Sequence, residues 1–168
     1  MSSAPFRVAP LEVALDRTPF NCGAVPLDAY FHHQVSQDVR RRATACFVAF
    51  SRDERIAGYY TLAPASLVLS DLPPEIGKQL PRHPSVPAVR MGRLAVDRAF
   101  KGQGLGAALL SDALARAARS PIAAFASVVE VCDEPALAFY RHHGFIALPD
   151  LPLTLFLPLV TLRRAAPA

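Results

Sequence analysis

The sequence predicts an α/β domain: one mixed β-sheet with helices on both faces. Three observations lead to this prediction. Residues 43–69 hold two apolar runs rich in β-branched residues around a charged turn, which is typical of a β-hairpin. Residues 86–132 run from an apolar strand through a glycine-rich turn and an amphipathic helix to a second apolar strand, which implies at least one parallel pair of strands. The length of 168 residues suits one domain, expected to span residues 1–168.

The first half of the chain is predicted to contain one helix, the hairpin and a surface loop. Residues 27–42 carry apolar side chains at helical spacing. The hairpin strands are expected at residues 43–50 and 55–69. Residues 71–87 hold five prolines and one short helix at residues 75–80, so we expect a surface loop suited to contact a substrate.

The middle of the chain is predicted to form the crossover. Residues 86–96 read as the central strand, and residues 104–119 as an amphipathic helix with an apolar face for the core. Residues 122–132 follow as a strand whose nearly continuous apolar run indicates burial on both faces.

The last part is predicted to be a short helix and one strand. Residues 134–143 form the helix, and Gly144 is its expected C-terminal cap. The strand is expected at residues 153–162, where Pro158 indicates an edge position or a bulge because proline cannot donate a ladder hydrogen bond.

The composition excludes several classes of protein. The chain is 52% hydrophobic, yet no apolar run is long enough to span a membrane, and the N-terminus lacks the apolar stretch of a signal peptide. We therefore expect a cytoplasmic protein. Cys22, Cys46 and Cys132 have no metal-binding or paired spacing, so we expect reduced thiols, and the five histidines lack the spacing of a metal site.

Positive charge is concentrated in one segment. The net charge of the whole chain is +4, whereas residues 78–119 hold eight basic and two acidic residues, a net charge of +6. Residues 40–42 are three further arginines. Such patches suit a polyanionic ligand, and nucleic acid is one. For residues 40–42 alone, an ordinary solvated face is the favoured interpretation.

The most informative segment is the glycine-rich stretch between the central strand and the following helix. Gly102, Gly104 and Gly106 alternate there. Without Cβ atoms, backbone N–H groups can approach a ligand closely. At the start of a helix, free N–H groups and the helix dipole favour an anion. The segment therefore predicts a binding site for a pyrophosphate.

Two nucleotide-binding motifs fit this segment poorly. A P-loop needs Lys-Ser or Lys-Thr after its last glycine, and neither follows Gly106. The letters of a dinucleotide fingerprint fit Gly102, Gly104 and Ala107, but residues 97–101 separate them from the strand, and Glu130 is distant for a ribose contact. Coenzyme A binding is the third interpretation, beside that of a tight glycine turn without a ligand.

Lys101-Gly102-Gln103-Gly104-Leu105-Gly106 resembles motif A of the GNAT superfamily of N-acetyltransferases, [Q/R]-x-x-G-x-[G/A], with lysine in the first position. The resemblance implies a GNAT-like fold with acetyl-CoA as cosubstrate and no metal. Amides of residues 103–107 would hold the pyrophosphate, and backbone groups of the preceding strand would pair with the pantetheine arm. The cofactor-binding residues so implied are Leu94, Ala95, Val96, Lys101, Gly102, Gln103, Gly104, Leu105, Gly106 and Ala107.

A second motif lies at residues 135–145. Ala136, Phe139, Tyr140, Gly144 and Phe145 fill a pattern common in GNAT enzymes, A-x-x-F-Y-x-x-x-G-F. The resemblance implies that the phenol of Tyr140 lies near the thioester sulfur and acts as general acid for the leaving thiolate. The alternative is that both aromatic residues only pack. No carboxylate stands out as a general base, so a water relay or a largely neutral amine would serve.

Further segments extend the resemblance over nearly the whole chain. Residues 20–23 (FNCG), 58–62 (GYYTL), 92–97 (GRLAVD) and 109–114 (LLSDAL) are similar to the GNAT toxins of type II toxin–antitoxin modules, the TacT-like group. The resemblance implies acetylation of the α-amino group of aminoacyl-tRNA, a block of translation, and a ribbon-helix-helix antitoxin as partner. A homodimer stays open. Candidates for contacts to tRNA phosphates are Arg82, Arg90 and Arg93.

The sequence is also compatible with two other functions. The chain could be a GNAT enzyme that acts on a small-molecule amine or a protein amine. It could also be a non-catalytic module that binds coenzyme A or an antitoxin.

Overall fold

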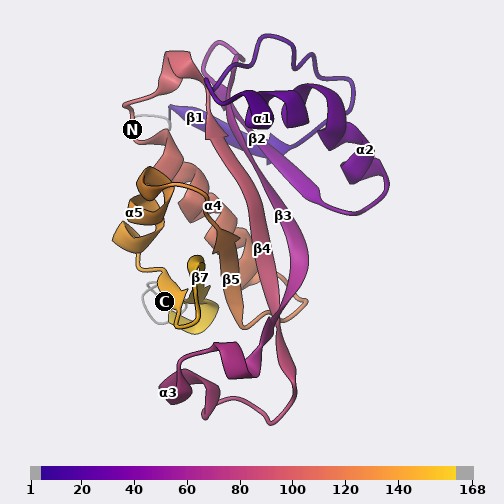
Figure 1. The fold of residues 1–168 in the computed structure, drawn as a ribbon. Helices are drawn as coiled ribbons and strands as arrows, with labels where there is room; N and C mark the ends of the chain where they lie inside the picture. The colour runs from indigo at the N-terminus through magenta and orange to yellow at the C-terminus, as the bar shows by residue number, and fades with distance from the viewer. Residues whose placement is uncertain (1–4, 162–168) are drawn as a thin grey trace. The chain divides into compact units, whose positions relative to one another are not determined.

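The computed structural model describes residues 5–161. Among these residues, seven strands form one sheet in the order β1-β2-β3-β4-β5-β7-β6 (Figure 1). The strands are β1 (Phe6–Pro10), β2 (Ala45–Ser51), β3 (Ile56–Val68), β4 (Ser85–Val96), β5 (Ala126–Glu130), β6 (Ile146–Leu148) and β7 (Leu151–Pro158). The helices are α1 (Val25–Ala29), α2 (Val35–Arg40), α3 (Pro74–Gly77), α4 (Leu105–Arg119) and α5 (Glu134–His142), with a π-helix η1 (Tyr30–Gln34) and 3-10 turns η2 (Leu69–Asp71) and η3 (Arg98–Phe100).

The chain forms two compact units. The first unit comprises Met1–Ala63 and Gly92–Ala113, and the second comprises Pro64–Met91 and Leu114–Ala168. None of the helices in residues 5–161 is long and apolar enough to cross a membrane.

The first unit contains the predicted hairpin and the predicted helix. β2 and β3 pair antiparallel, which confirms the hairpin. The helical segment runs through α1, η1 and α2, so the helix predicted at residues 27–42 is confirmed with a π-helical turn in its middle. The sequence did not indicate β1, which pairs antiparallel with β2.

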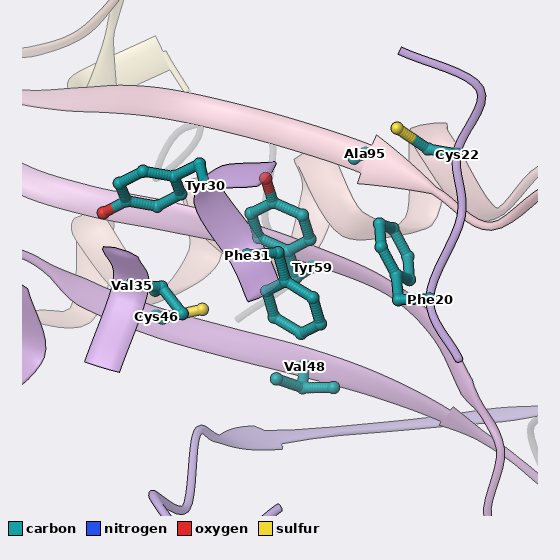
Figure 2. Packing of buried hydrophobic residues seen from close by; sticks show 9 residues of the cluster. All are labelled: Phe20, Cys22, Tyr30, Phe31, Val35, Cys46, Val48, Tyr59 and Ala95. Atoms are coloured by element: carbon teal, nitrogen blue, oxygen red, sulfur yellow. The ribbon is translucent and has the colours of Figure 1, made fainter. Parts of the chain in front are cut away.

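Aromatic side chains form the core of the first unit. Figure 2 shows Phe31 from the helical segment beside Tyr59 from β3, with Phe20 next to both. The rings of Phe31 and Tyr59 are stacked 4.3 Å apart, and Phe20 meets each of them edge-on. Offset stacking and edge contacts are the favoured geometries of aromatic pairs, so this cluster fixes the helical segment on the sheet.

A close approach of three elements depends on Gly58 in β3. A Cβ atom at this position would lie 2.7 Å from the carbonyl oxygen of Ala95 in β4 and 2.9 Å from Cδ1 of Leu109 in α4. Both distances are shorter than real Cβ contacts, so only glycine fits. Gly58 thereby allows α4, whose N-terminus belongs to the proposed cofactor site, to pack closely.

The second unit contains the parallel pair that the sequence predicted. Ala88 and Arg90 of β4 lie opposite Ala126 and Val128 of β5 in parallel register. β5 is buried from Ala126 to Val129, in agreement with the predicted burial. It starts at Ala126, four residues later than predicted, and ends at Glu130, two residues earlier than predicted.

Two expectations for this unit are corrected. β7 lies between β5 and β6, so Pro158 is not on an edge strand, and its pairing with Ala126 at the end of β7 shows no bulge. The edge strand is β6, which the sequence did not indicate. Residue 162, the predicted end of the last strand, lies outside the described residues. The predicted loop at residues 71–87 is shorter, because β4 begins at Ser85, and its helix is only the single turn of α3.

Candidate functional site

The connection between β4 and α4 forms an exposed turn that leads directly into a helix. Gly102 and Gly104 have φ angles of +81° and +78°, a region that favours glycine. A Cβ atom added at either position would meet no atom within 4 Å. The backbone conformation therefore selects glycine here, and the space above both residues is open to a ligand.

The start of α4 offers backbone donors to that space. α4 begins at Leu105, and the amide of Ala108 donates to the carbonyl of Gly104 at 3.1 Å. The amides of Leu105, Gly106 and Ala107 precede this bond and have no acceptor within the helix. Leu105 is buried and anchors the helix end, while Gln103 and Gly104 are exposed. The arrangement suits a diphosphate, because free N–H groups and the helix dipole both favour negative charge.

The predicted pantetheine-binding residues lie at the end of β4. Ala95 is buried in the core of the first unit, whereas its neighbours Leu94 and Val96 are half-buried and point to the other face of the strand. An extended ligand that lies along this strand would form hydrogen bonds with the backbone groups of these residues and not with their apolar side chains.

Lys101 makes a contact that the sequence analysis did not foresee. Its Nζ atom donates a hydrogen bond to the carbonyl oxygen of Cys22 at 2.7 Å. Asp97 caps the turn at its other end, where Oδ1 accepts from the amide of Ala99 at 2.9 Å. One of the three donors of the Lys101 ammonium group is therefore used inside the protein.

Tyr140 lies in the second unit, on α5. The side chain of Asp133 caps this helix by accepting from the amide of Ala136 at 2.8 Å. The ring of Tyr140 meets Phe139 and Phe145 edge-on, with centroids 5.1 and 5.3 Å apart. Desolvation of the hydroxyl raises the pKa of Tyr140 to about 12. The phenol is therefore a stable hydrogen-bond donor at neutral pH.

The three candidate arginines have different environments. Arg82 and Arg90 are exposed in the second unit, and Arg90 lies 3.4 Å from the carboxylate of Glu130 in a surface ion pair. Arg93, in the first unit, is half-buried, and its guanidinium carbon lies 3.4 Å from the ring centroid of Tyr30. Arg93 therefore packs against the protein, while Arg82 and Arg90 are accessible.

Tyr30 connects Arg93 to a carboxylate. The Tyr30 hydroxyl donates to Oδ2 of Asp38 at 2.8 Å. Burial is the main cause that raises the pKa of Tyr30, and the hydrogen bond from Tyr30 is the main cause that lowers the pKa of Asp38. Cation, ring and carboxylate thus form one local network, which explains why Arg93 is less accessible.

The chain is similar to known toxins over most of its length. It is 36% identical over 157 residues to the tRNA-acetylating toxin of Mycobacterium tuberculosis (strain ATCC 25618 / H37Rv), covering 92% of this chain and 91% of that protein. It is 30% identical over 158 residues to the probable toxin TacT of Sinorhizobium fredii (strain NBRC 101917 / NGR234), covering 88% and 87%.

Solved structures share the fold. AtaT complexed with acetyl-methionyl-tRNAfMet has a TM-score of 0.88 at 26% identity, covering 95% of this chain and 98% of that chain. AtaTR bound with acetyl-CoA has a TM-score of 0.82 at 26% identity, covering 96% and 98%. A mutant AtaT toxin bound to the C-terminus of the antitoxin AtaR and acetyl-CoA has a TM-score of 0.81 at 24% identity, covering 96% and 98%, which shows the fold alone.

The family assignment rests on the sequence itself. The model of the acetyltransferase (GNAT) family matches residues 11–145, which include the glycine-rich turn and the Tyr140 motif. This chain belongs to the acetyltransferase (GNAT) family.

Proposed function

We propose that this chain is an acetyl-CoA-dependent N-acetyltransferase that modifies the α-amino group of aminoacyl-tRNA and thereby acts as a toxin on translation. The observation that carries the proposal is the turn of Gly102 and Gly104, which leads into the free amides at the start of α4. The relative that is 36% identical and is named a tRNA-acetylating toxin supports the choice of acceptor.

We assign donor binding to the first unit. The amides of residues 103–107 hold the pyrophosphate of acetyl-CoA, because they precede the first intrahelical hydrogen bond of α4. Backbone groups of Leu94, Ala95 and Val96 hold the pantetheine arm as an added strand would. The AtaTR structure with acetyl-CoA supports the identity of the donor.

We assign the role of general acid to Tyr140. When the neutral acceptor amine forms its bond to the acetyl carbon, the bond to sulfur breaks, a thiolate leaves, and the nitrogen releases its extra proton to water. The pKa of Tyr140, raised to about 12, lies above the value of roughly 8.5 for a thiol. A hydrogen bond from the phenol to the developing thiolate is therefore favoured over complete transfer of the proton, and such a bond stabilises the leaving group.

The acceptor explains why no general base stands out. The α-amino group of a peptide titrates near roughly 7.7–8.0. The ester of an aminoacyl-tRNA makes its amine less basic, so a substantial neutral fraction exists at neutral pH. Arg82 and Arg90 are exposed and suited to contact tRNA phosphates. Arg93 is a weaker candidate because it packs on Tyr30.

The proposed function also suggests the partners. An antitoxin of the ribbon-helix-helix type, which the resemblance to TacT-like toxins implies, would neutralise the enzyme. A homodimer is compatible with the proposal. Since the proposed substrate belongs to translation, we place the activity in the cytoplasm, carried by residues 1–168 as one acetyltransferase domain.

The proposal is tested by incubating the protein with radiolabelled acetyl-CoA and a mixed pool of aminoacyl-tRNA. We expect label in the tRNA fraction, released as an N-acetyl amino acid when mild base cleaves the ester. Deacylated tRNA is the control and should stay unlabelled. Label found only in polyamines or in protein would contradict the tRNA substrate but not acetyl transfer. If no label is transferred to any amine, the chain is not an acetyltransferase, and the alternative of a non-catalytic binding module is favoured.

A further inference from the structure

An irregular segment before α1 is held largely by hydrogen bonds to groups from elsewhere in the first unit, four of them side chains. Residues 20–23, here called the supporting segment, belong to no helix or strand. Most of their backbone polar groups are nevertheless paired. The bonds join the Phe20 carbonyl to His32 Nε2 (2.8 Å), the Asn21 amide to Asp97 Oδ2 (2.9 Å), the Asn21 carbonyl to the Arg98 amide (2.9 Å), the Cys22 amide to Asp28 Oδ1 (2.8 Å), the Cys22 carbonyl to Lys101 Nζ (2.7 Å) and the Gly23 amide to Asn21 Oδ1 (2.9 Å).

Three of these bonds come from the connection that carries the glycine-rich turn. Asp97 and Arg98 bind Asn21 at the start of the connection, and Lys101 binds Cys22 immediately before Gly102. Asp97 is itself buried, and its second oxygen accepts from the amide of Ala99. The supporting segment therefore holds both ends of residues 97–101.

The C-terminal end of the turn is joined to α4 by the bond from the Ala108 amide to the Gly104 carbonyl, but the turn itself has few other neighbours. Gly102 and Gly104 are exposed, adopt left-handed conformations, and have no atom within 4 Å of the places where Cβ atoms would stand. A backbone with so few neighbours is free to move unless its flanks are fixed, and ordering it on ligand binding would cost conformational entropy. Fixed flanks remove part of that cost before the ligand arrives.

We propose that the supporting segment preorganises the pyrophosphate-binding turn, and that Asp97 and Lys101 are the positioning residues through which it acts. This inference rests on the proposed acetyl-CoA site and deepens it. It gives Lys101 a role inside the protein, because its ammonium group ties two segments that are 79 residues apart in the sequence. It also gives Asp97 a role in binding an anion, although its own charge is negative.

Asp97→Asn separates this inference from simple electrostatics, because the two predict changes of opposite sign. Removal of a negative charge next to an anion site strengthens the binding of coenzyme A if charge alone decides. If the supporting segment positions the turn, the variant weakens binding. The new amide group cannot accept from both the Asn21 and Ala99 amides with its two atoms, so one of these bonds is lost.

The experiment measures the dissociation constant of coenzyme A by isothermal titration calorimetry, together with amide hydrogen exchange of the ligand-free protein. For Asp97→Asn and for Lys101→Met we expect a dissociation constant about tenfold higher, as the loss of one charge-assisted hydrogen bond implies. We also expect faster exchange at residues 20–23 and 102–104. Lys101→Arg should restore part of the affinity, since it keeps a donor. Arg119→Gln, which removes an exposed cation from the last turn of α4, is the control and should leave the exchange unchanged.

Tighter or unchanged binding by Asp97→Asn would overturn the inference, as would unchanged exchange at residues 102–104 in both variants. Lys101 is exposed, so its variant keeps the test available if the buried Asp97 variant does not fold. A wild-type protein that does not bind coenzyme A would overturn the proposed function and this inference together. Normal binding by the wild type and by both variants would overturn only this inference.

Discussion

Tyr140 is the proposed general acid, and its chemistry depends on its surroundings. Its ring meets Phe139 and Phe145 edge-on, the residue is half-buried, and partial desolvation disfavours the charged form of its hydroxyl. We predict that Tyr140→Phe lowers kcat by about 10² to 10³, because the ring packing survives while the donor is lost. The Michaelis constant for acetyl-CoA should change less than about twofold, since the proposed donor site is built from backbone groups. Steady-state kinetics would measure both.

The matched control for this substitution is Tyr30→Phe. It removes a hydroxyl that binds Asp38 and has no proposed part in the chemistry. We expect a loss of stability of about 1 kcal/mol and an unchanged kcat. A Tyr140→Phe variant as active as the wild type would remove Tyr140 from the mechanism.

The raised pKa of Tyr140 also predicts the shape of the pH profile. Desolvation favours the neutral phenol, so the donor is present at every pH below about 12 and is lost only as the pH rises through that value. We therefore expect kcat/KM to rise with pH as the acceptor amine loses its proton, and then to stay level up to pH 10. Initial rates between pH 6 and 10 would test this. A decline that starts near pH 8 and disappears in Tyr140→Phe would show that the phenol titrates far lower than its burial implies.

Among the elements, the contact of β3, β4 and α4 depends on one missing side chain. Gly58→Ala would place a Cβ atom 2.7 Å from the backbone oxygen of Ala95, and backbone moves less easily than a side chain. We predict a loss of unfolding free energy of about 3 kcal/mol, the upper part of the range for overpacked cores. Urea denaturation would measure it.

Gly77→Ala is the control for this substitution. Gly77 lies in the helical turn α3, and its added Cβ atom would lie 3.5 Å from the Leu69 carbonyl oxygen, an ordinary contact. We expect the free energy of unfolding to rise by about 0.5–1 kcal/mol, because alanine restricts the unfolded chain. Equal stabilities of the Gly58 and Gly77 variants would show that the three elements can separate without cost.

Most elements could be predicted from the sequence because their patterns are local. The hairpin, the crossover helix and the helix of Tyr140 follow from apolar periodicity, turns and caps. The strands β1 and β6 could not be predicted. β1 ends in a proline and shows no alternation, and β6 has three residues, so each depends on the neighbour with which it pairs. The π-helical turn of η1 has no comparable local signal.

The candidate site could be predicted only in part, for a similar reason. The glycines and Tyr140 lie in contiguous motifs, and the cap of Asp97 is a local interaction. The bonds from Asp97 to Asn21 and from Lys101 to Cys22 join residues 76 and 79 positions apart. A pattern of residue types does not contain such pairings, because they arise only when the chain has folded.

For the whole molecule, some of the positive charges contribute to packing, whereas others are exposed and available to a ligand. Of the three arginines that the sequence pointed to, Arg93 is packed on Tyr30, whereas Arg82 and Arg90 are exposed. The surface pair of Arg90 with Glu130 is worth little, because the two side chains are 50% and 63% exposed and water screens them. Positive charge at Arg82 and Arg90 is therefore available to a polyanion without a large loss of stability.

We accordingly predict that Arg82→Ala and Arg90→Ala each weaken tRNA binding, whatever amino acid the tRNA carries, and each reduce the slope of log K against log salt concentration by about 1. The reason is that each phosphate contact releases condensed counterions when it forms. Arg93→Ala should instead lower the midpoint of urea unfolding, since it removes a cation from the ring of Tyr30. The control is Arg7→Ala, which removes an exposed cation that pairs with Glu54 and lies outside residues 78–119. Binding titrations at several salt concentrations would measure these slopes. If Arg7→Ala reduced the slope as much as Arg90→Ala, the attraction would come from the net charge of the chain and not from a located phosphate contact.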